Sequence, residues 1–368
     1  MDKTKVIFYN STLLKGGTEA YIKELIKCLD KSKFQIDIVI KDGDVVDEFI
    51  YNELKSCGCN IFLAKGSFVK RILFLRKFFK QTKNTYDVAH INATSQGAGL
   101  LSYMAKKYGK IKKVIFHSHM GGNDNNQSIV DKIGSKMMFN NTDCFTSCSA
   151  DASVFMFGKD FCDKHEIQVL NNSVDTQKFD FNPDKRKQIR KDLNLSDKDF
   201  AIIHVGRFAP QKNHKKVITV FDAYLKTNPN AKLFLIGHGD LLDETKEQVK
   251  SLNIENNVTF LGLQNNVQDF LQAADLFLFP SVHEGLGIVL VEAQCSGLPV
   301  VVSSTVPKLA CLCDDIFKFV DLDAADAVWA DAIKSFEKTK RVSRKETLKK
   351  LGFDKETAAK IVEKIYLK

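Results

Sequence analysis

The sequence contains no apolar run long enough to cross a membrane. Every such run is interrupted well before the ~18–20 residues that a spanning helix requires. The first residues, MDKTKVIFYN, lead directly into a strand-like segment and lack the layout of a secretory signal peptide. We therefore expect this chain to fold and remain in the cytoplasm.

The sequence also lacks a recognisable framework of cysteine ligands. Its nine cysteines are odd in number, and the close pairs Cys57/Cys59 and Cys311/Cys313 do not have the paired C-x2-C spacing of a zinc site. We interpret them as reduced thiols, as is usual in the cytoplasm. We predict no metal and no cofactor.

Acidic residues are fewer than basic ones. The 54 Lys and Arg residues against 45 Asp and Glu give a net charge of +9. This charge suits nucleotides, lipid diphosphates or phospholipid headgroups, and would also suit nucleic acid. The basic residues are spread over the chain without a known recognition motif, so we predict no nucleic-acid partner. A basic nucleic-acid-binding protein remains a remote alternative.

The pattern of apolar residues predicts an α/β fold. Short runs rich in Val, Ile and Phe alternate with helix-patterned segments, which is typical of buried parallel sheets with helices on both faces. The expected strands are 6–9, 36–40, 61–64, 88–92, 114–117, 144–147, 167–170, 201–205, 233–236, 258–261, 276–279, 300–303 and 317–320.

The chain is long enough for two domains, because 368 residues exceed what one hydrophobic core usually organises. The strand series restarts near residue 200, so we predict Rossmann-like domains over 1–175 and 200–350, with a linker over 176–199. The last helix, within 355–368, could pack back on the N-terminal domain. Open α/β sheets bind ligands at the carboxyl ends of their strands, so two facing domains would form a cleft.

The loop after strand 201–205 carries a possible anion site. It reads GRFAPQKN, in which Gly206 allows close backbone approach while Arg207 and Lys212 can converge on one phosphate. The alternative is a pair of solvated surface charges.

The segment after strand 276–279 carries a stronger signal, PSVHEGLGIVLVEA. Gly285 and Gly287 open an expected helix whose first N–H groups can hold a phosphate. Glu284 lies at the start of this helix and Glu292 two turns later, where each carboxylate can accept hydrogen bonds from vicinal sugar hydroxyls. Either glutamate alone could instead be an ordinary solvated helix residue.

In combination, these motifs resemble those of glycosyltransferase family 4, whose members are retaining enzymes with the GT-B fold. Arg207, Lys212 and the pair Glu284-x7-Glu292 occur in the family's order, and GHGD after strand 233–236 is similar to its G-x-G-x loop. The run EGLGIVLVEAQCSGLPVVVSSTVP looks closest to members that build capsular and exopolysaccharides. The resemblance covers nearly the whole chain.

The resemblance implies a role for each matching residue. Arg207 and Lys212 would hold the donor diphosphate. Glu284 would contact the donor hexose and Glu292 the ribose. The segments 262–263 and 265–267 would flank the base. Further donor-binding positions implied in this way are Gly206, Gly237, Gly285, Leu286 and Gly287.

In the first half, the paired glycines Gly16 and Gly17 precede a helix expected to start near Thr18. Alone, they indicate only a helix entry. With the other motifs present, they resemble the family's glycine loop, which lies across the cleft from the donor phosphates.

Strand 114–117 continues into HSHMGG, where the family commonly has a histidine near the reacting sugar. His119 matches this position better and His117 is the second candidate. We expect the two rings to point to opposite faces, so that only one reaches the cleft. A metal site is a rival interpretation without an evident third ligand, and a core or capping histidine is another.

The segment KGSFVKRILFLRKFFKQTK, residues 65–83, has seven Lys or Arg and no acidic residue. Phe68, Ile72, Leu75 and Phe79 recur at helical spacing, so other phenylalanines would be partly exposed. This predicts a helix that lies on an anionic membrane surface, or alternatively one that simply packs on its sheet. The membrane-surface candidates are Lys70, Arg71, Phe74, Arg76, Lys77 and Phe78. A second basic cluster comprises Lys106, Lys107, Lys110, Lys112 and Lys113.

The resemblance implies transfer of a hexose or N-acetylhexosamine from a UDP-sugar, with retention of configuration, to a lipid diphosphate-linked or other glycan acceptor at the inner face of the plasma membrane. Arg207, Lys212 and Glu284, together with His119, would be the catalytic residues, without a metal. GDP-mannose is the alternative donor. Rival enzymes are a sugar-nucleotide epimerase and a metal-dependent transferase that uses Asp42-Gly43-Asp44 or Asp321-Leu322-Asp323.

Overall fold

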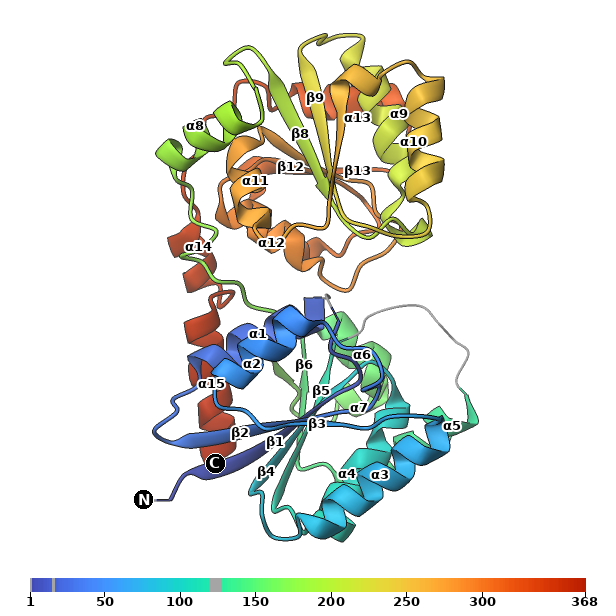
Figure 1. Cartoon of the computed structure of the whole chain (residues 1–368), viewed down its shortest axis with the longest axis vertical. Helices are drawn as coiled ribbons and strands as arrows, with labels where there is room; N and C mark the ends of the chain where they lie inside the picture. Colours follow the sequence, from blue (N-terminus) through green and yellow to red (C-terminus); the bar gives the residue numbers. More distant parts are fainter. Residues whose placement is uncertain (1, 15–16, 120–127) are drawn as a thin grey trace. The chain divides into compact units, whose positions relative to one another are not determined.

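The computed structural model describes residues 2–14, 17–119 and 128–368. The chain divides into two compact units, unit 1 (Met1–Ser173 and Gly352–Lys368) and unit 2 (Val174–Leu351). Each unit is a parallel β-sheet with helices on both faces (Figure 1). The predicted fold class, α/β with two Rossmann-like domains, is confirmed.

The sheet of unit 1 has seven strands among the described residues, in the order β3-β2-β1-β4-β5-β6-β7. All seven predicted strands form, with ends within two residues of those predicted. Because they are parallel, their carboxyl ends lie at one edge of the sheet. The strands are β1 (Thr4–Asn10), β2 (Phe34–Ile40), β3 (Ile61–Leu63), β4 (Val88–Ala93), β5 (Lys113–Ser118), β6 (Cys144–Ser147) and β7 (Gln168–Val169).

Helices cover both faces of this sheet. The helical segments of unit 1 are α1 (Gly17–Cys28), α2 (Glu48–Ser56), α3 (Phe68–Gln81), η1 (Gln96–Ala98), α4 (Gly99–Met104), η2 (Ala105–Gly109), α5 (Ile129–Asn141), α6 (Ala150–Phe157), α7 (Lys159–Cys162) and α15 (Lys355–Leu367). Alternate side chains of β1 enter two separate cores: Val6 and Phe8 pack with α1 and α2, whereas Ile7 and Tyr9 pack with α3 and α4. This burial on both faces is why β1 reads as a continuous apolar run.

The C-terminal helix α15 packs on α1 in unit 1, although the chain reaches it only after unit 2. Val362, Ile365 and Tyr366 enter the same core as Val6 and Phe8. Asp354 caps the helix by accepting from the backbone N–H groups of its first turn. The predicted return of the last helix to the N-terminal domain is therefore confirmed.

The sheet of unit 2, which is described throughout, has six strands in the order β10-β9-β8-β11-β12-β13. They are β8 (Phe200–Val205), β9 (Ala231–Ile236), β10 (Val258–Gly262), β11 (Leu276–Phe279), β12 (Val300–Ser303) and β13 (Phe317–Val320). The helical segments are α8 (Pro183–Asp192), η3 (Pro210–Lys212), α9 (His214–Leu225), α10 (Leu242–Ser251), η4 (Glu255–Asn257), α11 (Val267–Ala273), α12 (Ile288–Cys295), η5 (Lys308–Ala310), η6 (Asp314–Ile316), α13 (Asp326–Lys334) and α14 (Lys345–Lys350).

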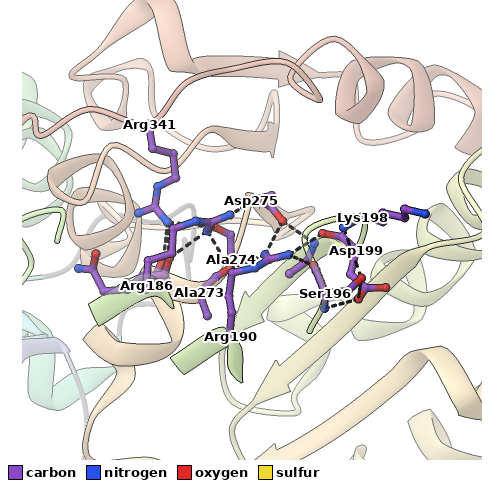
Figure 2. A network of polar contacts seen from close by, with 12 residues as sticks. Arg186, Arg190, Ser196, Lys198, Asp199, Ala273, Ala274, Asp275 and Arg341 are labelled. Atoms are coloured by element: carbon purple, nitrogen blue, oxygen red, sulfur yellow. Dashed lines mark hydrogen bonds and ion pairs between the residues drawn. The ribbon is translucent and has the colours of Figure 1, made fainter. Parts of the chain in front are cut away.

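The segment 176–199, which the sequence predicted as a linker, belongs to unit 2 and contains α8. Figure 2 shows why it is fixed: two arginines of α8 bind the end of α11 and the residue before β11. Arg186 Nη1 donates to the carbonyls of residues 272–274, and Arg190 Nη1 lies 3.0 Å from Asp275 Oδ2. Arg341 donates to the same helix end. Cations at a helix C-terminus are favourable, so α8 is part of the domain.

In the described parts of the chain, none of the helices combines the length and apolar character that crossing a membrane requires.

Candidate active site

The loop after β8 carries the first predicted donor-binding residues. Gly206 follows the strand at the carboxyl edge of the sheet, where open α/β sheets bind ligands. A Cβ on Gly206 would lie 3.0 Å from Cγ of Lys212, so a larger residue would press on that side chain. η3 ends at Lys212, and Asn213, with a left-handed φ of 53°, turns the chain into α9. This turn brings Lys212 back over the strand end.

Lys212 and Glu284 form an ion pair. The Lys212 ammonium lies 2.6 Å from Glu284 Oε1, and only 18% and 7% of the two side chains are exposed. The ammonium also lies 4.6 Å from the centre of the Phe279 ring. The residues are 72 positions apart in the chain, but they meet because β8 and β11 are neighbours in the sheet.

The Glu284 carboxylate is held by neighbours that the sequence motifs did not single out. The Ser281 hydroxyl donates to Glu284 Oε1. Gln211 Nε2 donates to the carbonyl of His283 over 2.9 Å, and the Gln211 carbonyl accepts from the N–H of Val282 over 2.8 Å. The loops after β8 and β11 are thereby tied together. The one available signal was the position of Ser281 and Gln211 inside the two motifs.

The helix after β11 begins at Ile288, with Gly287 as its N-cap residue. Gly287 has a φ of +73°, which glycine adopts without strain. Among the residues that the structure describes, no side chain caps the helix, so its first N–H groups and its dipole favour an anion at this end. Leu286 is buried and Gly285 is half-buried immediately before it. This arrangement differs slightly from the prediction, in which both glycines opened the helix.

Two other predicted donor residues lie on adjoining elements. Arg207 extends from the loop after β8 with an exposed side chain, and Glu292 is half-buried on α12. The structure therefore brings Lys212 and Glu284 into direct contact and places Arg207 and Glu292 on the loop and helix beside them.

Gly237 joins the loops after β8, β9 and β10. Its φ is +147°, and a Cβ there would lie 1.9 Å from the carbonyl oxygen of Gly206, so the two loops approach this closely only with glycine. The Gly237 N–H donates to the carbonyl of Gly262 over 2.9 Å. Gly262, which begins the segments 262–263 and 265–267 predicted to flank a base, thus adjoins Gly237.

The two histidines at the end of β5 lie side by side, with ring centroids 4.0 Å apart. The expectation that they point to opposite faces is wrong, because residues two apart in a strand share a face. They differ instead in depth. His117 has no exposed surface, whereas His119 is partly exposed just past the strand.

A chain of hydrogen bonds fixes these rings. The Tyr366 hydroxyl of α15 lies 2.7 Å from Nδ1 of His90, whose Nε2 lies 3.2 Å from Nδ1 of His117. Separately, Nε2 of His119 lies 2.8 Å from Oδ1 of Asn92. The sequence analysis missed His90, Asn92 and Tyr366. The spacing of His90 and Asn92 at the carboxyl end of β4 was the available signal.

Burial keeps these histidines neutral. It lowers the pKa of His119 and of His90 to about 3, and lowers the pKa of His117 well below its usual value, with neighbouring imidazoles adding to the effect at His90 and His117. At neutral pH, His119 can therefore give or accept a hydrogen bond but carries no charge. In the described part of the chain, no cluster of three or more His, Cys, Asp or Glu residues is placed to hold a metal ion.

The glycine loop is described only in part. Gly16 lies outside the described residues, and Gly17 opens α1. Glu19, in the first turn, is buried and accepts from the Thr12 hydroxyl over 2.6 Å. Glu19 thus ties the helix start to the chain that leaves β1.

Only some of the predicted membrane-surface residues of α3 are exposed. Phe78 is 6% exposed, because its ring packs on Phe62, Phe79 and Tyr86, so its assignment as a surface residue is wrong. Phe74 is half-buried. Lys70, Arg76 and Lys77 are exposed, as are Phe68, Val69 and Leu73.

Arg71, another membrane candidate, is engaged within unit 1. Its guanidinium binds the carboxylates of Asp42 and Asp44. Asp44 also accepts from the N–H of Gly66 over 3.0 Å. The Asp42-Gly43-Asp44 sequence, considered above as a metal site, therefore has a structural partner.

Comparisons with known proteins agree with this architecture. Residues 185–352 match the model of "Glycosyl transferases group 1", and residues 15–178 match that of "Glycosyltransferase Family 4". The chain is similar to the putative glycosyltransferase EpsF of Bacillus subtilis, with 27% identity over 95% of this chain and 93% of that protein. It is also similar to the Escherichia coli UDP-Gal:alpha-D-GlcNAc-diphosphoundecaprenol alpha-1,3-galactosyltransferase, with 24% identity over 82% and 80%.

Among solved structures, HepE of Anabaena in complex with UDP has a similar fold, with a TM-score of 0.78, 17% identity, and 98% and 99% of the two chains covered. Two Rossmann-like units with these matches define a glycosyltransferase of the GT-B fold. Within that class, the chain belongs to glycosyltransferase family 4.

Proposed function

We propose that this glycosyltransferase moves a hexose or N-acetylhexosamine from a UDP-sugar to a lipid diphosphate-linked glycan, with retention of configuration, during assembly of a capsular, exopolysaccharide or other surface polysaccharide. The main support is the Lys212–Glu284 pair at the carboxyl edge of unit 2. It sets a cation and a carboxylate side by side, next to the exposed Arg207 and the uncapped start of α12. A diphosphate joined to a polyhydroxyl sugar needs this combination.

The chemistry follows from the charges. As the sugar leaves, negative charge grows on the β-phosphate, and Lys212, Arg207 and the α12 amides stabilise it. When the phosphate replaces Glu284 as the partner of the Lys212 ammonium, the Glu284 carboxylate can accept hydrogen bonds from the sugar hydroxyls. Glu292 accepts from the ribose. No metal takes part in these steps.

On the acceptor side, His119 supplies a neutral imidazole whose Nε2 is bound to Asn92. A neutral ring can hydrogen-bond a sugar hydroxyl without attracting the departing phosphate. The leaving phosphate itself assists removal of the acceptor proton, because no carboxylate among the described residues is an evident dedicated base.

The choice of UDP and of a lipid diphosphate acceptor rests on relatives. The name of the E. coli galactosyltransferase states a UDP-sugar donor and a diphosphoundecaprenol acceptor, and HepE was solved with UDP. The exposed Lys70 and Lys77 of α3, with Phe68 and Leu73, would support peripheral contact with an anionic membrane from the cytoplasmic side.

The test is transfer with the purified chain. UDP- and GDP-sugars are offered with a lipid diphosphate-linked monosaccharide acceptor, and the new linkage is assigned by NMR. We expect one UDP-sugar to be transferred with its axial anomeric configuration kept. Transfer from GDP-mannose alone, or inversion at the anomeric carbon, would refute the donor or the stereochemical part of the proposal.

A further inference from the structure

Two buried histidines of unit 2 adjoin Lys212, and the proposed chemistry gives them no role. His204 lies on β8 and His214 is the first residue of α9, with 0% and 1% of their surfaces exposed. Their rings meet edge to face, with centroids 4.7 Å apart. The His204 ring also stacks 5.6 Å from the ring of Phe279, over which the Lys212 ammonium lies.

The hydrogen of the His204 ring is on Nδ1. This nitrogen lies 2.8 Å from the carbonyl oxygen of Leu278, which can only accept a hydrogen bond, so Nδ1 must donate. Burial, the neighbouring His214 and the Lys212 charge lower the pKa of His204 well below its usual value, so the ring is neutral at neutral pH. Because a neutral imidazole has a single N–H, Nε2 of His204 is a bare acceptor.

This acceptor is shielded from solvent and has no hydrogen-bond partner among the described residues, and the same holds for both nitrogens of His214. Burial, with the Lys212 charge adding to it, lowers the pKa of His214 to about 4, so that ring is neutral as well. Proteins pair nearly all of their buried polar groups, so this cluster needs a hydrogen-bond donor close by. The cation whose charge reaches both rings is Lys212.

Gly206 lies between His204 and the Lys212 side chain. A Cβ on this glycine would lie 3.2 Å from Nε2 of His204 and 3.0 and 3.1 Å from Cγ and Cδ of Lys212, so the two side chains border the same small space. The ammonium has three N–H groups. Among the described residues it donates to Glu284 Oε1 and lies over the Phe279 ring, which leaves an N–H group to donate elsewhere. Rotation about the last bonds of the lysine side chain would direct that group at Nε2.

We infer that His204 is a positioning residue for Lys212: its bare Nε2 accepts a hydrogen bond from the ammonium when the donor diphosphate draws Lys212 away from Glu284. The inference rests on the proposed function, because it gives the lysine a partner once the Lys212–Glu284 contact is exchanged. A neutral acceptor holds the ammonium without cancelling its charge, whereas a second carboxylate would weaken its attraction for phosphate. A side chain at position 206 would fill the space between the two groups.

The first measurement is the tautomer of His204 in the full chain without nucleotide, by NMR of ¹⁵N-labelled histidine. The His204 resonances are identified by their loss in His204→Asn. Nδ1 should carry the hydrogen, and Nε2 should have the chemical shift of an unprotonated nitrogen. The Nε2 resonance should move when UDP binds and stay in place with UMP, which lacks the β-phosphate. A hydrogen on Nε2, or an Nε2 resonance that does not respond to bound UDP, would overturn the inference.

Two substitutions separate this role from a structural one, because asparagine places an amide N–H near the position of Nδ1 and glutamine places an amide oxygen near that of Nε2. His204→Asn keeps a donor to Leu278 but loses the acceptor, so kcat for UDP-sugar hydrolysis should fall by at least about tenfold with little change in thermal unfolding. His204→Gln keeps the acceptor but loses the bond to Leu278, so it should unfold at a lower temperature yet retain most of the rate.

The matched control is His165→Asn, an exposed histidine of unit 1, which should keep the wild-type rate. An active His204→Asn beside an inactive His204→Gln would show a structural role and overturn the inference, and so would equal rates in these two variants. Absence of hydrolysis in the wild type would count against the proposed function alone, because the tautomer is measured without a donor.

Discussion

Lys212 and Glu284 are partners of each other, with the ammonium nitrogen 2.6 Å from Oε1. Family resemblance assigns them to different parts of the donor, the diphosphate and the hexose. The structure adds that the two side chains contact each other, with the Ser281 hydroxyl also bound to Glu284. Under the proposed function, donor binding exchanges this contact for two others, so that recognition of the phosphate is coupled to recognition of the sugar.

The two glutamates should be separable by their ligands. Glu284→Gln should bind free UDP like the wild type but lose roughly 10–100-fold in affinity for the UDP-sugar, as expected for a lost charged hydrogen bond of about 1.5–3 kcal/mol. Glu292→Gln should weaken the binding of free UDP itself. Calorimetry with free UDP and with the UDP-sugar measures these affinities. If each variant binds the two ligands as tightly as the wild type does, the assignments are wrong.

Activity should survive removal of divalent cations. In the proposed function, Lys212, Arg207 and helix N–H groups provide the positive charge at the leaving phosphate. Asp42 and Asp44 are already bound by Arg71. Initial rates of UDP release are compared with and without EDTA after dialysis. A rate that EDTA abolishes and Mn²⁺ restores would contradict this prediction.

Removing the Tyr366 hydroxyl should destabilise unit 1. In Tyr366→Phe, Nδ1 of the buried His90 loses its partner, which costs about 1–3 kcal/mol. Urea unfolding of this variant and of Tyr108→Phe, a partly exposed tyrosine near α3, gives the comparison. Equal losses in the two variants would mean that the hydrogen bond contributes little.

Stability should fall as the pH is lowered from 7 to 5. The pKa of His119 and of His90 is about 3 in the fold, below the value of 6.5 for an exposed histidine. The unfolded chain therefore binds protons in this range that the folded chain does not, and stability is lost as the pH falls. For one such histidine the loss is on the order of 2 kcal/mol at pH 5. Urea midpoints at pH 7, 6 and 5 measure it, and a constant or rising midpoint would contradict the pKa shifts.

The strands could be predicted from the sequence because parallel strands buried on both faces leave continuous apolar runs, as in β1 and β11. The approximate place of the candidate site was predicted from motifs at strand ends. The contact between Lys212 and Glu284 could not be foreseen, since it depends on β8 lying next to β11 in the sheet.

The errors have local causes. The charge and spacing of residues in α3 suggested that Phe78 and Arg71 would be available at the surface. In the structure, the Phe78 ring packs on Phe62 and the Arg71 guanidinium binds Asp42. A polar segment read as a linker became α8, because its arginines find the carbonyls at the end of α11. Long-range partners of this kind leave no periodic pattern in the sequence.

The most direct test of the account is release of nucleoside diphosphate from sugar nucleotides by variants of the phosphate-binding residues. The wild type should slowly hydrolyse at least one UDP-sugar without acceptor. Arg207→Ala and Lys212→Ala should each lose about 100–1000-fold in rate, corresponding to ~3–4 kcal/mol of lost stabilisation of the leaving phosphate. Lys215→Ala, an exposed charge on the neighbouring α9, should keep the wild-type rate. Full activity in Arg207→Ala or in Lys212→Ala would contradict the account.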